Sequence, residues 1–146
     1  MPQLSAAAQD LYTKIQAIPA LASSAGLVLG GKEPDPGMTK IPLPAAWILL
    51  SQFDNENVGA LLNRPPTIAN VRALYGVMLY LPYISQSDLI TNQLPLLEQV
   101  IAAIQGTAIT GTGASQRWTL HSGKLVLLNT DRLGYHLIFE LSTPLV

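Results

Sequence analysis

The sequence has no cysteine and few charged residues. Without cysteine no disulfide can form, which excludes the disulfide-rich secreted folds and is typical of proteins in a reducing cytoplasm. Lys and Arg total 8 and Asp and Glu total 9, so only 12% of the 146 residues are charged, against about 25% in typical soluble domains. Hydrophobic residues reach 49%, and the mean hydropathy is +0.31. A single copy must therefore expose much uncharged and apolar surface, which either enters a membrane or is buried against other copies or partners.

Long apolar runs and basic clusters are also missing. No stretch reaches the ~18 apolar residues of a membrane-spanning helix, and the richest run, residues 94–104, is interrupted by Pro95, Glu98 and Gln99. The first residues show no basic segment followed by an apolar one, so we expect no signal peptide. With a formal net charge of −1, the electrostatic drive for nucleic-acid binding is lacking. We therefore expect a soluble domain that assembles, without membrane insertion or specific nucleic-acid recognition.

Three segments of the first half have a clear periodicity. Apolar residues in 4–18 recur at spacings of four and three, which predicts an amphipathic helix that ends before Pro19. Residues 45–52 are almost wholly apolar, and this short length favours a strand covered on both faces. Residues 71–81 alternate as a long strand whose second face is also mostly uncharged. Between them we expect a long connection over 20–44, with a short strand at 27–29, and a polar excursion or loose hairpin arm over 53–70.

The second half predicts one helix followed by strands. A helix is expected between residues 87 and 105, with Gly106 as its stop. Its expected buried residues are Leu97, Val100, Ile101 and Ile104. Pro95 would cost ~3 kcal/mol inside a helix, so the helix either begins near residue 92 after a short turn or is kinked. Residues 116–121 and 124–129 predict a hairpin with a two-residue turn at Ser122-Gly123, and 133–141 predict a final strand.

Together these elements predict a single domain over residues 1–146 with an α+β fold. We expect a mostly antiparallel sheet of four to five strands, two helices packed on one face, and long loops. Trp47 and Trp118 are interpreted as core or interface anchors.

The sequence offers no catalytic, cofactor-binding or metal-binding set. His121 and His136 fall on predicted strands with no further ligands at metal spacing, which favours solvent-facing side chains. Residues 111–115 begin like a dinucleotide fingerprint, but Gln116 replaces the third glycine and a strand follows, so a flexible loop is expected. Asp131-Arg132 is interpreted as an exposed ion pair or a turn signal. We therefore do not expect an enzyme.

The order of these segments resembles a known family. A proline-led apolar strand (PLPAAWILL) follows the first helix, and a long strand (ALYGVMLYLPY) precedes the second helix (LLEQVIAAIQG). A tryptophan-containing pair of segments (RWTLHSGKLVLLN) and an aromatic strand (LGYHLIFEL) end the chain. Over nearly its whole length the sequence resembles the tail terminator and tail-completion proteins of tailed bacteriophages, particularly the Mu-type branch.

The resemblance implies a structural virion protein without a cofactor. Such a protein forms a ring, expected to be hexameric, at the head-proximal end of the tail, after assembly in the host cytoplasm. It stops polymerisation of the tail tube and contacts the tube protein, a neck or connector protein and, in a contractile tail, the sheath protein. The alternatives are another phage neck or head-completion adaptor, a tube subunit, or a small hydrolase or ligand-binding domain that uses the loop at 106–115.

Two polar loops are the expected contacts with neighbouring subunits or the tube. They cover residues 32–40 and 53–66, and ordering such loops costs ~1–2 kcal/mol per fixed residue, which a partner must offset. The candidate interface residues in and beside them are Lys32, Lys40, Phe53, Asn55, Arg64 and Arg72.

Overall fold

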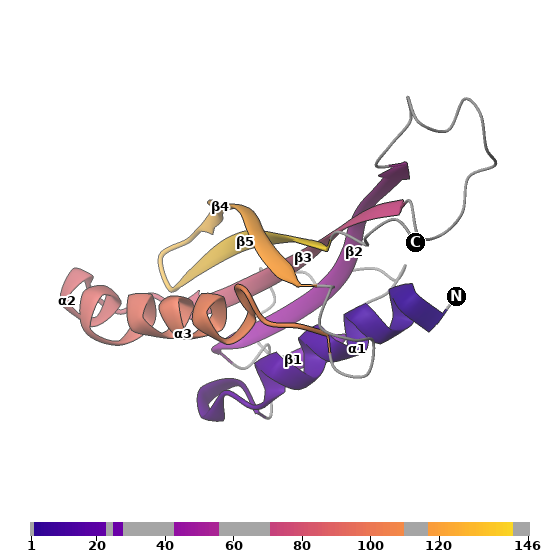
Figure 1. The fold of residues 1–146 in the computed structure, drawn as a ribbon. Helices are drawn as coiled ribbons and strands as arrows, with labels where there is room; N and C mark the ends of the chain where they lie inside the picture. The colour runs from indigo at the N-terminus through magenta and orange to yellow at the C-terminus, as the bar shows by residue number, and fades with distance from the viewer. Residues whose placement is uncertain (1, 23–24, 28–42, 56–70, 110–116, 142–146) are drawn as a thin grey trace, which may run out of the picture.

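The computed structural model describes residues 2–22, 25–27, 43–55, 71–109 and 117–141 (Figure 1), with side chains except at 2–3, 25–27, 53–55 and 71–72. Its helical segments are α1 (Pro2–Gln16), the 3-10 turn η1 (Pro19–Leu21), α2 (Gln86–Asp88), the π-helical turn η4 (Leu89–Gln93) and α3 (Leu94–Ile104). Its strands are β1 (Ala25–Leu27), β2 (Ala45–Asn55), β3 (Val71–Pro82), β4 (Trp118–Leu128) and β5 (Arg132–Leu141).

The strands form one sheet in the order β1-β2-β3-β5-β4. β1 runs parallel to β2, and every other neighbouring pair is antiparallel. Because α1 and α3 both contribute to the core on one side of this sheet, the expected α+β fold is confirmed. The short strand expected at 27–29 is described as β1 at 25–27, and residues 28 and 29 lie outside the described residues.

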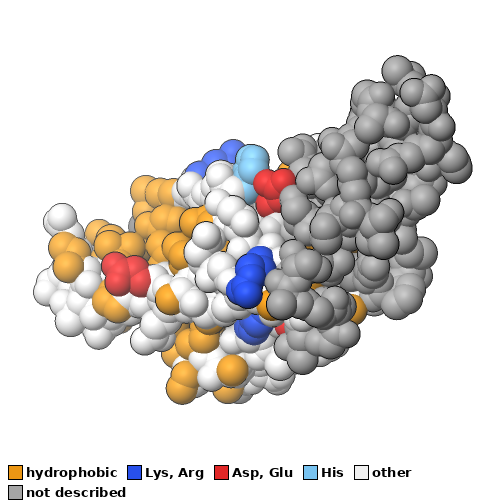
Figure 2. All heavy atoms as spheres, in the orientation of Figure 1, with side chains coloured by type: hydrophobic (Ala, Val, Ile, Leu, Met, Phe, Trp, Pro, Cys, Tyr) orange, Lys and Arg blue, Asp and Glu red, His pale blue; other side chains and the backbone are white. Residues whose placement is uncertain are grey.

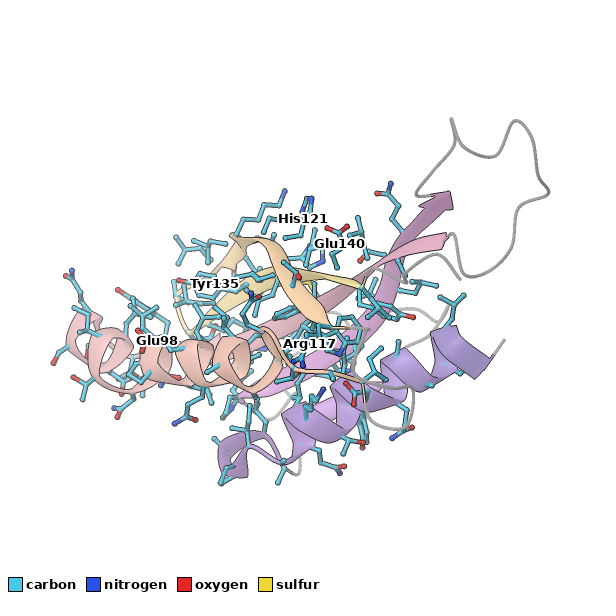
Figure 3. The ribbon with its side chains drawn as sticks, viewed as in Figure 1. Glu98, Arg117, His121, Tyr135 and Glu140 are labelled. Carbon is cyan, nitrogen blue, oxygen red and sulfur yellow. The ribbon has the colours of Figure 1, made fainter. Side chains whose placement is uncertain are left out.

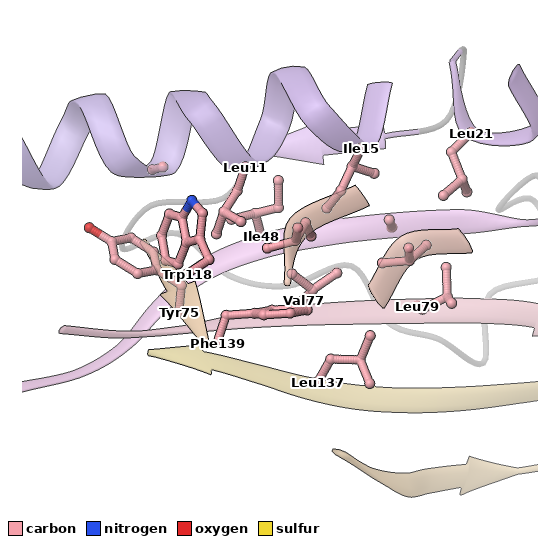
Figure 4. Packing of buried hydrophobic residues seen from close by; sticks show 14 of the residues in the cluster. Leu11, Ile15, Leu21, Ile48, Tyr75, Val77, Leu79, Trp118, Leu137 and Phe139 are labelled. Atoms are coloured by element: carbon pink, nitrogen blue, oxygen red, sulfur yellow. The ribbon is translucent and has the colours of Figure 1, made fainter. Parts of the chain in front are cut away.

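The core lies between the helices and the face of the sheet that carries the odd-numbered residues of β3 and β5 (Figure 4). Leu11 and Ile15 of α1 are fully buried there, as the spacing of apolar residues predicted. Val77 of β3 pairs with Ile48 of β2 and Leu137 of β5, so three neighbouring strands present aliphatic side chains to the helices. Each such side chain contributes ~1.5–3 kcal/mol when fully buried.

The second face of the sheet is also largely apolar, as the mostly uncharged alternate positions of β3 indicated. Met78 and Tyr80 are buried on this face, and the ring of Tyr80 meets that of Trp47 edge-on at 5.3 Å. Gly76 shares this face, where a Cβ would come within 2.6 Å of His136 Nε2. This close approach explains a glycine in the middle of a long strand.

The helical segment around Pro95 is irregular in a way that accommodates the proline. Ser85 Oγ accepts a hydrogen bond from the Asp88 backbone N–H (3.1 Å) and caps α2. The π-helical turn η4 follows, and Pro95 then falls in the first turn of α3, where a missing N–H is tolerated. Side-chain amides of Asn92 and Gln93 donate to Asp88 (2.7 and 3.0 Å), and these bonds lower its carboxyl pKa.

The short turn before the second helix and the stop at Gly106, which has φ 77°, are therefore confirmed. The predicted buried side of this helix needs correction at two positions. Val100 and Ile104 are buried with Leu96, whereas Leu97 and Ile101 are half-buried.

The predicted hairpin with a turn at Ser122-Gly123 is wrong, because β4 runs without interruption from residue 118 to 128. A two-residue turn of this kind needs a positive φ, which Gly123 does not have. Instead, a Cβ at Gly123 would lie 2.9 Å from Leu137 Cδ2, so the glycine allows β5 to approach closely. The chain reverses later, where the Asn129 backbone N–H donates to the Arg132 carbonyl (2.9 Å) and β4 meets β5.

Candidate interaction surface

Three of the predicted interface residues share one end of the sheet. The β2–β3 ladder continues past the pair Phe53 and Ala73 to Arg72 and Asn55, which pair with Asp54 and Val71 respectively. Within the described residues, β5 accompanies β3 only as far as Ala73. The last two residue pairs of β2 and β3, here called the β2–β3 arm, therefore extend beyond the rest of the described sheet (Figure 1). The remaining candidates, Lys32, Lys40 and Arg64, lie outside the described residues.

β4 is one edge of the sheet, and β5 is its only neighbour among the described strands. Its first residue, Trp118, is fully buried, but most of the strand after it is exposed. Opposite β5, the register of β4 shifts between Leu120 and Ser122 and again between Leu125 and Leu127. Such bulges bend an edge strand and hinder the addition of a further strand to it.

Exposed apolar side chains gather near the far end of β4. The apolar patch, as we call it, consists of Leu125, Val126 and Leu128 of β4 with Ile84, and Ile90 of η4 is also exposed. Tyr83, next to Ile84, donates its backbone N–H to the Asp131 carbonyl (2.9 Å), which holds the end of β3 against the turn between β4 and β5. Figure 2 shows the apolar side chains over this end of the molecule, above the region of α2 and α3.

The patch exists because the sheet is wider than the helix layer. Leu128 pairs with Leu133 and shares its side of the sheet, yet Leu133 is 3% exposed and Leu128 is 64% exposed. Leu125 likewise pairs with Tyr135, which is half-buried against the core, and remains 45% exposed. A helix in a third position would cover these side chains, and within the described residues no helix occupies it. These side chains are apolar, as core residues are, but they lie at the surface.

A buried polar contact fixes the other end of β4. Trp118 Nε1–H donates to Asp10 Oδ2 (2.9 Å), and Lys14 Nζ donates to the same oxygen (2.6 Å) and to the Ala108 carbonyl (2.8 Å). The Trp118 ring meets the Tyr75 ring edge-on at 5.4 Å. Trp118 is thus a core anchor, one of the two roles expected for it. The sequence did not point to Asp10, because a charged residue outside the apolar spacing of a helix is expected to face solvent, whereas Asp10 is buried.

The polar groups on the second face do not form a compact site. His121 and Glu140 project from β4 and β5 on the side away from the helices (Figure 3). Glu140 and His136 share this face, as predicted, at positions opposite Leu74 and Met78 of β3. His121 is exposed, but His136 is half-buried with its Nε2 atom buried, so the expectation of a solvent-facing side chain is wrong for His136. Among the described residues, no three potential metal ligands lie together.

Asp131-Arg132 was interpreted as an exposed ion pair or a turn signal, and the two residues lie at the turn between β4 and β5 with unequal exposure. The Asp131 and Arg132 side chains are 63% and 7% exposed, and the Arg132 guanidinium lies 3.4 Å from the Asp131 carboxylate.

The longest described helix, α1, has 15 residues, and none of the described helices combines the length and hydropathy needed to cross a bilayer.

No protein-family model matches the sequence, and no curated protein matches it at a significant level.

Proposed function

We propose that the chain is a structural virion protein, a tail terminator that forms a hexameric ring at the head-proximal end of a phage tail tube. The ring stops tube polymerisation and joins the tube to the neck. Its partners are further copies of the chain, the tube protein and a neck or connector protein, together with the sheath protein in a contractile tail. The proposal assigns the chain no reaction, cofactor or metal.

The observation that carries this proposal is the β2–β3 arm. It contains Asn55 and Arg72 and begins directly after Phe53, and all three are residues expected at an interface from the sequence alone. A ring requires head-to-tail contacts in which one surface of a subunit meets a different surface of the next. A two-stranded extension beyond the sheet suits such a contact, because it reaches a neighbour without disturbing the core. The low charge content favours the same reading, since interface centres are depleted in charged residues.

Deleting residues 55–63 tests this proposal. The shortened protein is expected to keep its circular dichroism spectrum and cooperative unfolding, because the sequence predicts a polar loop over residues 53–66. It should fail to form rings in native mass spectrometry and fail to cap tubes assembled from the tube protein in electron microscopy. The exposed α1 variant Gln9→Ala, which should cap tubes normally, is the control.

Two outcomes would contradict the proposal. Tubes of uncontrolled length with the full chain present would exclude a terminator, and binding to a neck protein alone would favour the adaptor alternative. Unfolding of the deletion variant would place residues 55–63 in the core, and Arg72→Glu would then test the arm without shortening the chain.

A further inference from the structure

We propose that a cavity beside the helical segment 86–104 binds an aliphatic cation, that is, an ammonium or guanidinium group on an alkyl stem. The cavity lies between η1, Pro44 directly before β2, and the segment formed by η4 and α3, and its volume is about 430 Å³. None of the residues that line it belongs to the β2–β3 arm, so the inference does not depend on the role in the tail.

The cavity is lined by one polar side chain that is almost wholly buried. Gln93 is 8% exposed, and its Nε2 donates a hydrogen bond to Asp88 Oδ2 (3.0 Å). Its Oε1 accepts no hydrogen bond from a described residue and is not sealed from solvent, so this oxygen is open to a donor in the cavity. An amide oxygen in a mostly buried side chain is costly to leave without a donor, and a bound N–H group offsets that cost.

The π-helical turn explains the orientation of this amide. Asp88 and Gln93 are five positions apart, a spacing that puts two residues on different sides of an α-helix but stacks them in a π-turn. The Asn92 amide, which also lines the cavity, donates to the other Asp88 oxygen (2.7 Å). Because one carboxylate holds both N–H₂ groups, the carbonyl oxygens of the two amides remain as acceptors for a ligand.

The charges around the cavity favour a cation over a neutral or anionic ligand. Asp88 and Glu98 are the only charged residues between positions 86 and 104, and η1 has none. The hydrogen bonds from Asn92 and Gln93 lower the carboxyl pKa of Asp88, so this group is ionised at neutral pH and polarises the amides that it holds. A carboxylate in this position repels an anion and strengthens the attraction between the amide oxygens and a positively charged N–H donor.

The walls of the cavity suit an alkyl stem. Pro44, Pro95 and Leu96 line it beside the amides, and the exposed side chains of Thr91 and Gln99 supply further oxygen acceptors. Lysine and arginine stems pack along apolar surface of this kind while the charged head group reaches polar atoms. The ligand is therefore either a free alkylamine or a basic side chain of another protein, two sources that share one chemistry.

Three probes with stems of equal length test the charge preference: n-butylammonium, n-butanol and butyrate. Each is titrated into the full chain while NMR follows the methyl groups of Leu96 and Thr91, which are observable in a monomer and in a large ring. Butylammonium should shift these resonances with a dissociation constant about tenfold below that of butanol, and butyrate should not bind. Butanol that binds as tightly as butylammonium, or the absence of a shift with all three probes, overturns the inference.

Two variants test the residues. Gln93→Met keeps the length of the side chain but removes the acceptor, and should weaken butylammonium binding about tenfold. Asp88→Asn removes the charge at an exposed position, and should lower the affinity for butylammonium to that for butanol. Gln86→Met is the matched control, because it makes the same replacement at an exposed position outside the cavity and should bind like the wild type.

The outcomes of the variants decide the proposal even if one of them is unstable. Wild-type affinity in a Gln93→Met protein with a native circular dichroism spectrum overturns the inference. If Gln93→Met does not fold, wild-type affinity in Asp88→Asn overturns it instead.

A lysine peptide, acetyl-Gly-Lys-Gly-amide, distinguishes the two sources of the cation. Binding at least as tight as that of butylammonium assigns the cavity to a basic side chain of another protein. A peptide that does not bind while butylammonium does assigns the cavity to free alkylamines, and the inference stands in both cases. Loss of tube capping in the deletion of residues 55–63, with butylammonium binding retained, shows that the cavity and the proposed ring contact are independent.

Discussion

Replacing Asp10 with alanine should lower the free energy of unfolding by about 1.5–3.5 kcal/mol. The carboxylate accepts hydrogen bonds from Trp118 Nε1 and Lys14 Nζ, and the Asp10 side chain is 4% exposed. Removing it leaves the indole N–H buried without this acceptor, which costs ~1–3 kcal/mol. The lost ion pair adds roughly 1 kcal/mol, because Lys14 is 18% exposed and keeps the Ala108 carbonyl as an acceptor. The higher helix propensity of alanine returns about 0.5 kcal/mol.

Urea unfolding followed by tryptophan fluorescence and circular dichroism measures this difference. Gln9→Ala is the control on the same helix, where the side chain is exposed, and should change the free energy of unfolding by less than ~0.5 kcal/mol. A double-mutant cycle between Asp10→Ala and Trp118→Phe should give a coupling of about 1.5–3 kcal/mol for the indole-to-carboxylate bond. If Asp10→Ala is as stable as the control, the contact does not hold α1 to β4 and the reasoning is refuted.

Three further predictions concern the sheet. The buried Tyr75 hydroxyl donates to the Leu4 carbonyl (2.8 Å), and burial raises its pKa from 10.0 to about 12. Because the unfolded chain then loses this proton first, Tyr75 should make stability fall as the pH rises from 10 to 12, and a Tyr75→Phe variant should lack that component of the fall in pH-dependent unfolding. Gly76→Ala should destabilise by about 1–3 kcal/mol in thermal or urea unfolding, since its Cβ would lie 2.6 Å from His136 Nε2; wild-type stability would contradict the close approach. His121→Ala should change stability by less than ~0.5 kcal/mol, because the side chain is exposed, and neither it nor His136→Ala should abolish a reaction. A defined turnover lost in either variant, with assembly intact, would overturn the structural role.

The sequence was sufficient where one periodic signal covers a whole element. The alternation along β3 and β5 predicted both strands and the side of β5 that meets the core, because a period of two over ten residues fits no other regular structure. The helix α1 was equally clear, since its apolar residues occupy one stripe.

Local signals failed where a distant residue decides the outcome. Ser122-Gly123 has the composition of a hairpin turn, yet the glycine is needed because Leu137 of the neighbouring strand approaches it. Leu125 and Leu128 are apolar residues on the helix side of β4, and only the limited width of the helix layer leaves them exposed. Nothing in their own neighbourhood in the sequence distinguishes these cases.

The contact between Trp118 and Asp10 joins residues 108 positions apart, which has a consequence for folding on the ribosome. At ~5–20 residues per second, α1 is synthesised roughly 5–20 s before the tryptophan that completes its docking site. During this interval α1 lacks the contact between Asp10 and Trp118, and the core that covers its apolar side, with Leu11 and Ile15, is incomplete. The N-terminal helix is therefore made early and completes its packing late, and nascent chains that stop before residue 118 should bind chaperones more strongly than the finished protein.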